Sequence, residues 1–182
     1  MKHLSLARKR KIHLALIDAF EKIYHSILDS VAATIVNHCI GAGQIKLAYQ
    51  YTLMAAQYAN KAFAPDDANH LFQSMESLLT ANIYLFGPPE IISFYTQWAR
   101  GNLQFNERDL AITHAEKLLQ FGHRLKDDYL IGTGYLYLGL AKSSNQLGSS
   151  DPMQYFDKAI MLLNNLPPTL ELIHCKVEKA VR

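Results

Sequence analysis

Apolar residues recur at spacings of three and four along almost the whole chain, in segments that glycine and proline separate. This spacing gathers side chains on one face of an α-helix, whereas a half-buried strand would alternate with a period of two. We find no convincing alternating segment. The breaks fall at Pro65, Gly87–Pro89, Gly148, Pro152 and Pro167–Pro168. The sequence therefore predicts an all-α protein.

The breaks leave nine segments long enough to be helices. They are expected over residues 4–25, 28–42, 44–63, 66–80, 89–104, 107–123, 127–147, 152–165 and 168–181. Asp66 and Asp67 put acidic side chains into a first turn, and Pro152 stands at the first helical position of another segment, which are both favourable. Because the connections are short, consecutive helices are expected to pack as antiparallel hairpins.

The composition is that of a folded protein. Hydrophobic residues make up 49% of the 182 residues and charged residues 19%, which excludes intrinsic disorder. The length suits a single domain over residues 1–182. A formal net charge of +2 is too small to indicate nucleic-acid binding by itself, so no direct nucleic-acid partner is expected.

Cysteine content and hydropathy bear on the compartment. Cys39 and Cys175 are far apart in sequence and make no disulfide framework, which favours a reducing compartment. No apolar run approaches the roughly 18 residues of a membrane span. The amino-terminal stretch MKHLSLARKRKIHLAL carries charge where a secretory signal needs an apolar core. We therefore expect a cytoplasmic protein without a membrane partner.

The chain repeats a pattern of large and small residues. Placing YTQWARGNLQ over YLYLGLAKSS aligns Trp98 with Leu138 and Ala99 with Gly139, each pair 40 residues apart. A large residue followed by a small one, with a small residue in the next helix, lets two helices cross closely. The large side chain then fills the space beside the crossing.

This pattern resembles the tetratricopeptide repeat. The small positions of that motif would be Ala48 and Ala55 within AGQIKLAYQYTLMAA, Ala99 and Ala111 in two consecutive helices, and Gly139 and Ala159 in two others. The chain departs from the motif at Thr52 and Ala115, where an aromatic residue is usual, and in its longer period. The resemblance implies a right-handed superhelix of antiparallel helices, an α-α solenoid. Its pairs would cover about residues 28–63, 66–104, 107–147 and 152–181, preceded by a docking helix at 4–25.

A narrower resemblance covers about residues 8–165. The segments RKRKIHLALIDAFEKIY, NHCIGAGQIKLAYQYTLMAAQYA and APDDANHLFQSMESLL resemble, in this order, the helical region of large bacterial signalling ATPases and MalT-type transcriptional regulators. The resemblance implies an interaction or sensing module within a larger regulatory protein, next to an ATPase module. An irregular helical bundle without repeat ancestry is the alternative.

The sequence contains no pattern typical of catalysis. His38–Cys39 and His174–Cys175 are neighbours whose side chains point about 100° apart on a helix, so neither pair easily chelates one ion. His-Glu-x-x-His, Cys-x-x-Cys and Gly-x-Ser-x-Gly do not occur. The stretch GAGQIK lacks the strand and the Gly-Lys-Ser/Thr ending of a phosphate loop. We expect no metal, no cofactor and no enzymatic activity.

Candidate partner-binding residues follow from the repeat resemblance. Residues of the first helices that do not meet the second helix are expected on the concave side of the superhelix. They are Asn37, Arg100, Gln104, Thr133 and Leu140. In peptide-binding repeats an asparagine at such a place holds a peptide backbone. The lysines of a carboxylate clamp are absent, so capture of a C-terminal acid is not expected.

A basic run at Arg8, Lys9, Arg10 and Lys11 is the densest charge cluster. Through Arg8, Lys9 and Lys11 it is expected to contact an acidic partner, a neighbouring module or phosphate, and a solvated helix face is the alternative. It lacks the interleaved aromatic residues of sites for single-stranded nucleic acid.

The amino-terminal helix is expected to dock on the helix at 28–42. Its apolar residues follow a spacing of three and four, at Ile12, Leu16, Ala19, Phe20 and Ile23. Such a helix is stable only when its apolar face is packed. We therefore expect this stripe to be buried and the basic end to remain free.

Three functions remain open from the sequence. The first is an interaction module that binds a protein, a peptide or a neighbouring module. The second is a sensor that holds a small-molecule effector in an aromatic pocket, with Trp98, Tyr95 and Tyr135 only partly buried. The third is self-association as a homodimer through the apolar stripe of Leu170, Ile173 and Val177.

Overall fold

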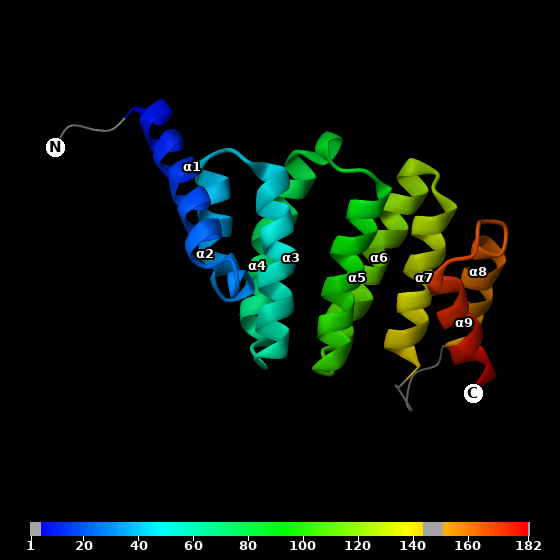
Figure 1. Cartoon of the computed structure of the whole chain (residues 1–182). Coiled ribbons are helices and arrows are strands. Elements are labelled where there is room, and N and C mark those ends of the chain that lie inside the picture. The colour runs from blue at the N-terminus through cyan, green and yellow to red at the C-terminus, as the bar shows by residue number, and fades with distance from the viewer. Residues whose placement is uncertain (1–4, 144–150, 182) are drawn as a thin grey trace. The chain divides into compact units, whose positions relative to one another are not determined.

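The computed structural model of the chain describes residues 5–143 and 151–181 (Figure 1). In these ranges the helices are α1 (Leu6–Ile23), α2 (Leu28–Gly41), α3 (Ile45–Lys61), α4 (Pro65–Ala81), the short 3-10 helix η1 (Ile83–Leu85), α5 (Pro88–Gln104), α6 (Arg108–Leu125), α7 (Asp128–Lys142), α8 (Met153–Leu163) and α9 (Leu170–Ala180). The described residues contain no strand, so the prediction of an all-α protein is confirmed. The predicted extension of the seventh helix to residue 147 lies outside the described residues.

Helix starts are fixed by local chemistry. The Asp127 carboxylate accepts a hydrogen bond from the backbone N–H of Leu130 at 2.9 Å, and Thr169 caps α9 in the same way. These bonds satisfy amide groups that have no partner within the helix. Pro65 and Pro88 stand at the first positions of α4 and α5, where proline removes no helical hydrogen bond. The proline breaks in the sequence therefore located these starts well.

The chain divides into two compact units, an N-terminal unit of residues 1–86 and a C-terminal unit of residues 87–182. α1 to α4 and η1 belong to the first unit, and α5 to α9 belong to the second. The boundary falls inside the predicted helix pair at 66–104. A single repeat domain over the whole chain stays a prediction.

The N-terminal unit is built on small residues of α3. α3 packs against α2 and α4, and α2 also packs against α1. Ala48, Ala55 and Ala59 of α3 are buried, as the stripe of alanines predicts. An alanine side chain ends at Cβ, so the neighbouring helices approach the α3 backbone closely. Larger side chains such as Ile35 and Phe72 fill the rest of this core.

In the C-terminal unit, α7 packs against both α6 and α8, and also contacts α5 and α9. Its glycines permit the close crossings. A Cβ atom on Gly139 would lie 2.6 Å from the ring of Phe156, and one on Gly132 would lie 2.7 Å from Leu163. No side chain other than hydrogen fits at such distances. The large–small pattern of the sequence thus corresponds to real crossings between α7 and α8.

α1 contacts α2, but only part of the predicted stripe is turned towards it. Ile17 is its buried residue, and Phe20 is only partly buried. Ile12, Leu16 and Ile23 remain 43%, 37% and 69% exposed. The prediction of a buried stripe at these three positions is therefore wrong.

The reason is that Phe20 and polar side chains outside the stripe make the specific contacts of α1. The ring of Phe20 lies 5.7 Å from that of His38, and the hydroxyl of Tyr51 donates a hydrogen bond of 2.6 Å to the Glu21 carboxylate. His13 and His38 approach each other, with 3.0 Å between their Nδ1 atoms. These contacts turn a mixed aromatic and polar face of α1 towards α2 and α3.

Candidate partner-binding groove

The N-terminal unit carries a groove of about 470 Å³ that is lined by α2, α3 and α4. Ala55 and Ala59 of α3 and Ala62, its C-cap residue, line it, at spacings of four and three that put them on one face. α2 and α4 both pack against α3 and form the two walls. The groove exists because alanines leave the space between the two walls unfilled.

Apolar and neutral residues make up most of the walls. On α2 these include Ala33, Val36 and Ile40, and on α4 they include Leu71. Asn37 also lines the groove, and its side chain is exposed. An exposed amide beside apolar side chains can donate to and accept from the backbone of a bound segment. The sequence prediction placed this residue on a binding surface, and the structure places it in the groove.

One end of the groove is acidic. Asp29 lies in the first turn of α2 and Asp67 in the first turn of α4, and both line the groove. The three-residue connections make α2 and α4 antiparallel to α3, so both helices begin at the same end. The two carboxylates also suit the helix dipoles, which favour anions in a first turn. The groove therefore combines an apolar floor with negative charge at one end.

The other predicted site residues lie outside this groove. Arg100 and Gln104 of α5 are exposed, and Leu140 of α7 is partly buried. Arg8, Lys9 and Lys11 are exposed in the first turns of α1.

Thr133 is completely buried, so its prediction as a contact residue on an open surface is wrong. It stands between Gly132 and Gly134. The first glycine lets Leu163 of α8 approach α7, and the second lets Leu119 of α6 do so. The resulting close packing leaves no opening through which a partner could reach Thr133.

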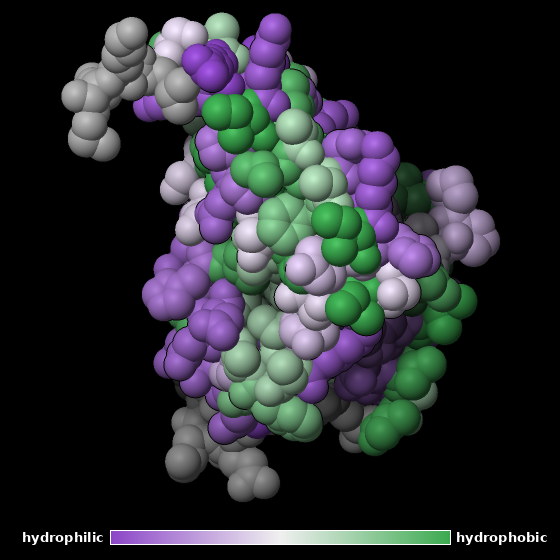
Figure 2. Space-filling view, turned by 60° about the vertical axis from the view of Figure 1, so that its left-hand side comes forward, coloured by the Kyte–Doolittle hydropathy of each residue, from purple (hydrophilic) through white to green (hydrophobic). Residues whose placement is uncertain are grey.

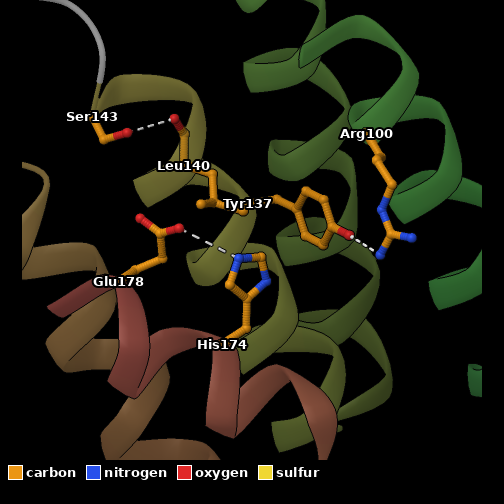
Figure 3. A network of polar contacts seen from close by, with 6 residues as sticks. All are labelled: Arg100, Tyr137, Leu140, Ser143, His174 and Glu178. Atoms are coloured by element: carbon orange, nitrogen blue, oxygen red, sulfur yellow. Dashed lines mark hydrogen bonds and ion pairs between the residues drawn. The ribbon is translucent and has the colours of Figure 1, made fainter. Parts of the chain in front are cut away.

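A side-chain hydrogen bond joins α5 and α7 in the C-terminal unit. Figure 3 shows Arg100 reaching from α5 to Tyr137 on α7, where its Nη2 donates to the tyrosine hydroxyl at 3.1 Å. On α9, His174 faces Glu178 at 3.5 Å. Arg100 is thus engaged within the unit while its side chain stays exposed. Its clearest role in this structure is to hold α5 beside α7.

The aromatic pocket that a small-molecule sensor needs is not formed by the residues expected to form it. Tyr95 is 1% exposed and Trp98 is 3% exposed. Trp98 stacks on His114 with 3.7 Å between the ring centres. Burial, with a smaller contribution from the charge of Lys117, lowers the pKa of His114 to about 3. The expectation that Tyr95 and Trp98 are partly buried is wrong, and both belong to the core.

The thiols are poorly placed for chemistry. Cys39 and Cys175 are completely buried. Burial raises the pKa of Cys39 to about 11 and that of Cys175 to about 12, so both are protonated at neutral pH. A protonated thiol is a weak nucleophile and a weak metal ligand. Within residues 5–143 and 151–181, no three His, Cys, Asp or Glu side chains gather in a way that could hold a metal ion.

The apolar stripe of α9 is open to solvent. Leu170, Ile173 and Val177 are all exposed, while Leu172 and Cys175 make the buried face of the helix. The stripe meets the steric requirement of the self-association hypothesis. Nothing in the described residues shows what covers it.

Comparisons with known protein families, with curated proteins and with solved structures found no match. Among the described helices, none is both long and apolar enough to span a bilayer.

The sequence had indicated Asn37, but it gave no indication that Asp29, Asp67 and Tyr58 would share one groove with it. Asp67 was visible only as a favourable first-turn residue.

Proposed function

We propose that the chain is a non-catalytic interaction module and that its N-terminal unit binds a helical segment of a protein partner in the α2–α3–α4 groove. The observation that carries the proposal is the groove itself, an apolar channel of about 470 Å³ between two helices with Asn37 beside it. Its volume lies within the range of about 300–1,000 Å³ that is usual for binding pockets. Its open, elongated lining suits one face of an amphipathic helix.

The length of the groove supports a helical ligand. Asp29 and Ile40 mark its extent along α2 and are eleven residues apart, or about 16 Å at 1.5 Å per residue. A ligand helix of about three turns matches this length. Its apolar side chains would fill the space above Ala55 and Ala59, and its polar face would remain in water.

The tetratricopeptide resemblance belongs to the same proposal. In the C-terminal unit α7 contacts α5 and α9 as well as its neighbours in sequence, an arrangement in which alternate helices lie side by side. Stacked helix pairs of a right-handed superhelix have this feature. This arrangement supports the proposal that the whole chain is a repeat module of a larger regulatory protein.

Selection of binding peptides followed by a blocking substitution tests the groove. A library of helical peptides is selected against the full chain, and the affinities are then measured for wild type, Ala33→Arg and Thr34→Arg. Ala33 is exposed and lines the groove, whereas Thr34 is its exposed neighbour on α2 outside the lining. We expect Ala33→Arg to weaken binding about tenfold or more and Thr34→Arg to leave it unchanged. Peptides that bind Ala33→Arg as tightly as wild type would exclude the groove as their site.

A further inference from the structure

α1 presents an apolar face that nothing in the described residues covers. Ile12, Leu16 and Ile23 lie on one side of the helix and are exposed. Ile17 and Phe20, on another side, pack towards α2. Figure 2, in which the side of the chain that carries α1 comes forward, shows hydrophobic residues running between hydrophilic ones. α1 therefore has a second apolar face that its packing against α2 does not use.

The charge at the start of α1 is unfavourable for the helix itself. Arg8, Lys9, Arg10 and Lys11 are exposed, and the first turn contains no acidic residue. Cations at a helix N-terminus oppose the helix dipole, whereas anions there stabilise a helix by about 0.3–1 kcal/mol each. Helix stability therefore does not account for this basic end. An anionic surface facing the basic end would account for it.

The groove has the complementary features. Asp29 and Asp67 supply negative charge at one end, and the lining beyond them is mainly apolar. Ile12 and Ile23 are eleven residues apart, which is the same extent along a helix as that between Asp29 and Ile40. Charge, polarity and length all match between the exposed face of α1 and the groove.

We propose that α1 of a second copy of this chain occupies the groove. Ile12, Leu16 and Ile23 then lie along the groove, and Arg8 and Lys9 lie about one turn beyond its acidic end, where their long side chains reach back towards Asp29 and Asp67. This inference rests on the proposed function of the groove. α1 of the same copy is already held against α2 by another face, so the groove takes its helix from a neighbour. If the two copies exchange helices reciprocally, the assembly closes as a two-fold dimer.

Sedimentation velocity of the full chain tests the proposal across a range of concentrations. Leu16→Glu alters the exposed face of α1, and Ala33→Arg blocks the groove. Leu14→Glu is the matched control, because Leu14 is 39% exposed against 37% for Leu16 and points to a different side of α1. Thr34→Arg is the control for the groove. Circular dichroism and thermal melting establish that all four variants are folded.

We expect wild type to dimerise and its dimer to weaken as salt rises. Leu16→Glu and Ala33→Arg should each raise the dimer dissociation constant about tenfold or more, and the two controls should not. An equimolar mixture of Leu16→Glu and Ala33→Arg should recover association in part, because the mixed dimer keeps one of its two α1–groove contacts free of both substitutions.

Three results would overturn the proposal. The first is a wild-type chain that stays at its monomer mass of 20.6 kDa at every concentration. The second is an equal change of the dimer dissociation constant in Leu14→Glu and Leu16→Glu. The third is a mixture of Leu16→Glu and Ala33→Arg that associates no better than either variant alone. These outcomes are separate from failure of the proposed function. A monomeric chain whose selected peptides still distinguish wild type from Ala33→Arg would keep the groove and lose only this occupant.

Discussion

At the scale of single residues, His114 occupies a place in the core of the C-terminal unit where a hydrocarbon side chain is usual. It is 3% exposed, and neither ring nitrogen has a hydrogen-bond partner among the described residues. A buried polar group without a partner costs about 1–3 kcal/mol. Stacking on Trp98 offsets part of that cost while the ring is neutral. Protonation would place a charge in the same apolar surroundings, which is why the pKa of His114 falls.

His114 should make the stability of the C-terminal unit depend on pH. In the unfolded chain a histidine takes up a proton near pH 6.5, whereas the pKa of folded His114 is about 3. The unfolded state therefore binds more protons below pH 6.5, and stability is lost as the pH falls. We expect a loss approaching about 1.4 kcal/mol per pH unit from this residue between pH 6 and pH 5.

The measurement is urea unfolding followed by circular dichroism at pH 7.5, 6.5, 5.5 and 5.0, for wild type and His114→Phe. The variant keeps a ring against Trp98 and has no titrating group. Its stability should fall less steeply with decreasing pH, and at pH 7.5 it should equal or exceed that of wild type. Parallel pH profiles would show that His114 is not buried as the structure has it.

Gly139 is a residue at which the space available beside the helix decides whether a larger side chain is tolerated. Alanine is normally better than glycine in a helix by about 1 kcal/mol, so Gly139→Ala would stabilise α7 if space allowed. The ring of Phe156 lies 2.6 Å from the position of the new Cβ and is itself completely buried. We expect Gly139→Ala to lower the free energy of unfolding by about 1–3 kcal/mol. A double-mutant cycle with Phe156→Leu checks the cause, because the smaller side chain should make the alanine less harmful.

At the scale of elements, the sequence predicted where helices lie better than which way they face. Glycine and proline mark the ends, and α4 and α5 begin at prolines. α1 shows the limit of the pattern. Its apolar residues surround more than one side of the helix, so spacing alone could not choose between Ile12 and Ile17 as the buried position. The hydrogen bond between Tyr51 and Glu21 and the ring contacts of His38 decide it, and they link residues far apart in sequence.

Long-range contacts also explain why the sequence predicted the candidate groove only in part. Asn37 was predicted because a repeat motif places it by its position within one helix. The acidic end of the groove needs Asp29 and Asp67 from two helices that are not neighbours in sequence. The prediction that Thr133 lies on a binding surface was wrong for a related reason. The burial of Thr133 depends on how closely α6 and α8 approach the glycines beside it.

The docking of α1 should weaken in mild acid. His13 and His38 share a hydrogen bond between their Nδ1 atoms at 3.0 Å, which requires that at least one ring be neutral there. Burial and, to a smaller extent, the charge of His13 lower the pKa of His38 below 6.5. The stabilising neutral form is therefore present above pH 6.5 and is lost as the pH falls below it.

Hydrogen exchange of the α1 amides measures this effect at pH 7.5 and pH 5.5 after correction for the intrinsic exchange rates. Wild type should lose protection in α1 at the lower pH, while His38→Gln, which keeps a neutral hydrogen-bonding side chain, should show the same protection at both. Loss of protection in His38→Gln as well would assign the acid sensitivity to other groups.

At the scale of the whole molecule, the division into two compact units implies two cores with their own stabilities. Ile35 and Phe72 belong to the first core, and Trp98 and Leu136 belong to the second. Trp98 is the chain's single tryptophan, so its fluorescence reports on the C-terminal unit alone. Circular dichroism reports on the helices of both units. The two signals together can therefore show whether the cores unfold as one cooperative block.

We expect Ile35→Ala to separate the two signals. Ile35 is completely buried on α2, and deleting its side chain beyond Cβ should cost the N-terminal unit about 2–5 kcal/mol. In urea the circular dichroism transition should then begin at a lower concentration, while the midpoint of the Trp98 fluorescence transition stays where wild type has it. Leu136→Ala is the matched control and should shift the fluorescence midpoint by a similar free energy. A fluorescence midpoint that moves equally in both variants would mean that the two units unfold as one, because cooperative unfolding passes the loss in either core to the whole chain.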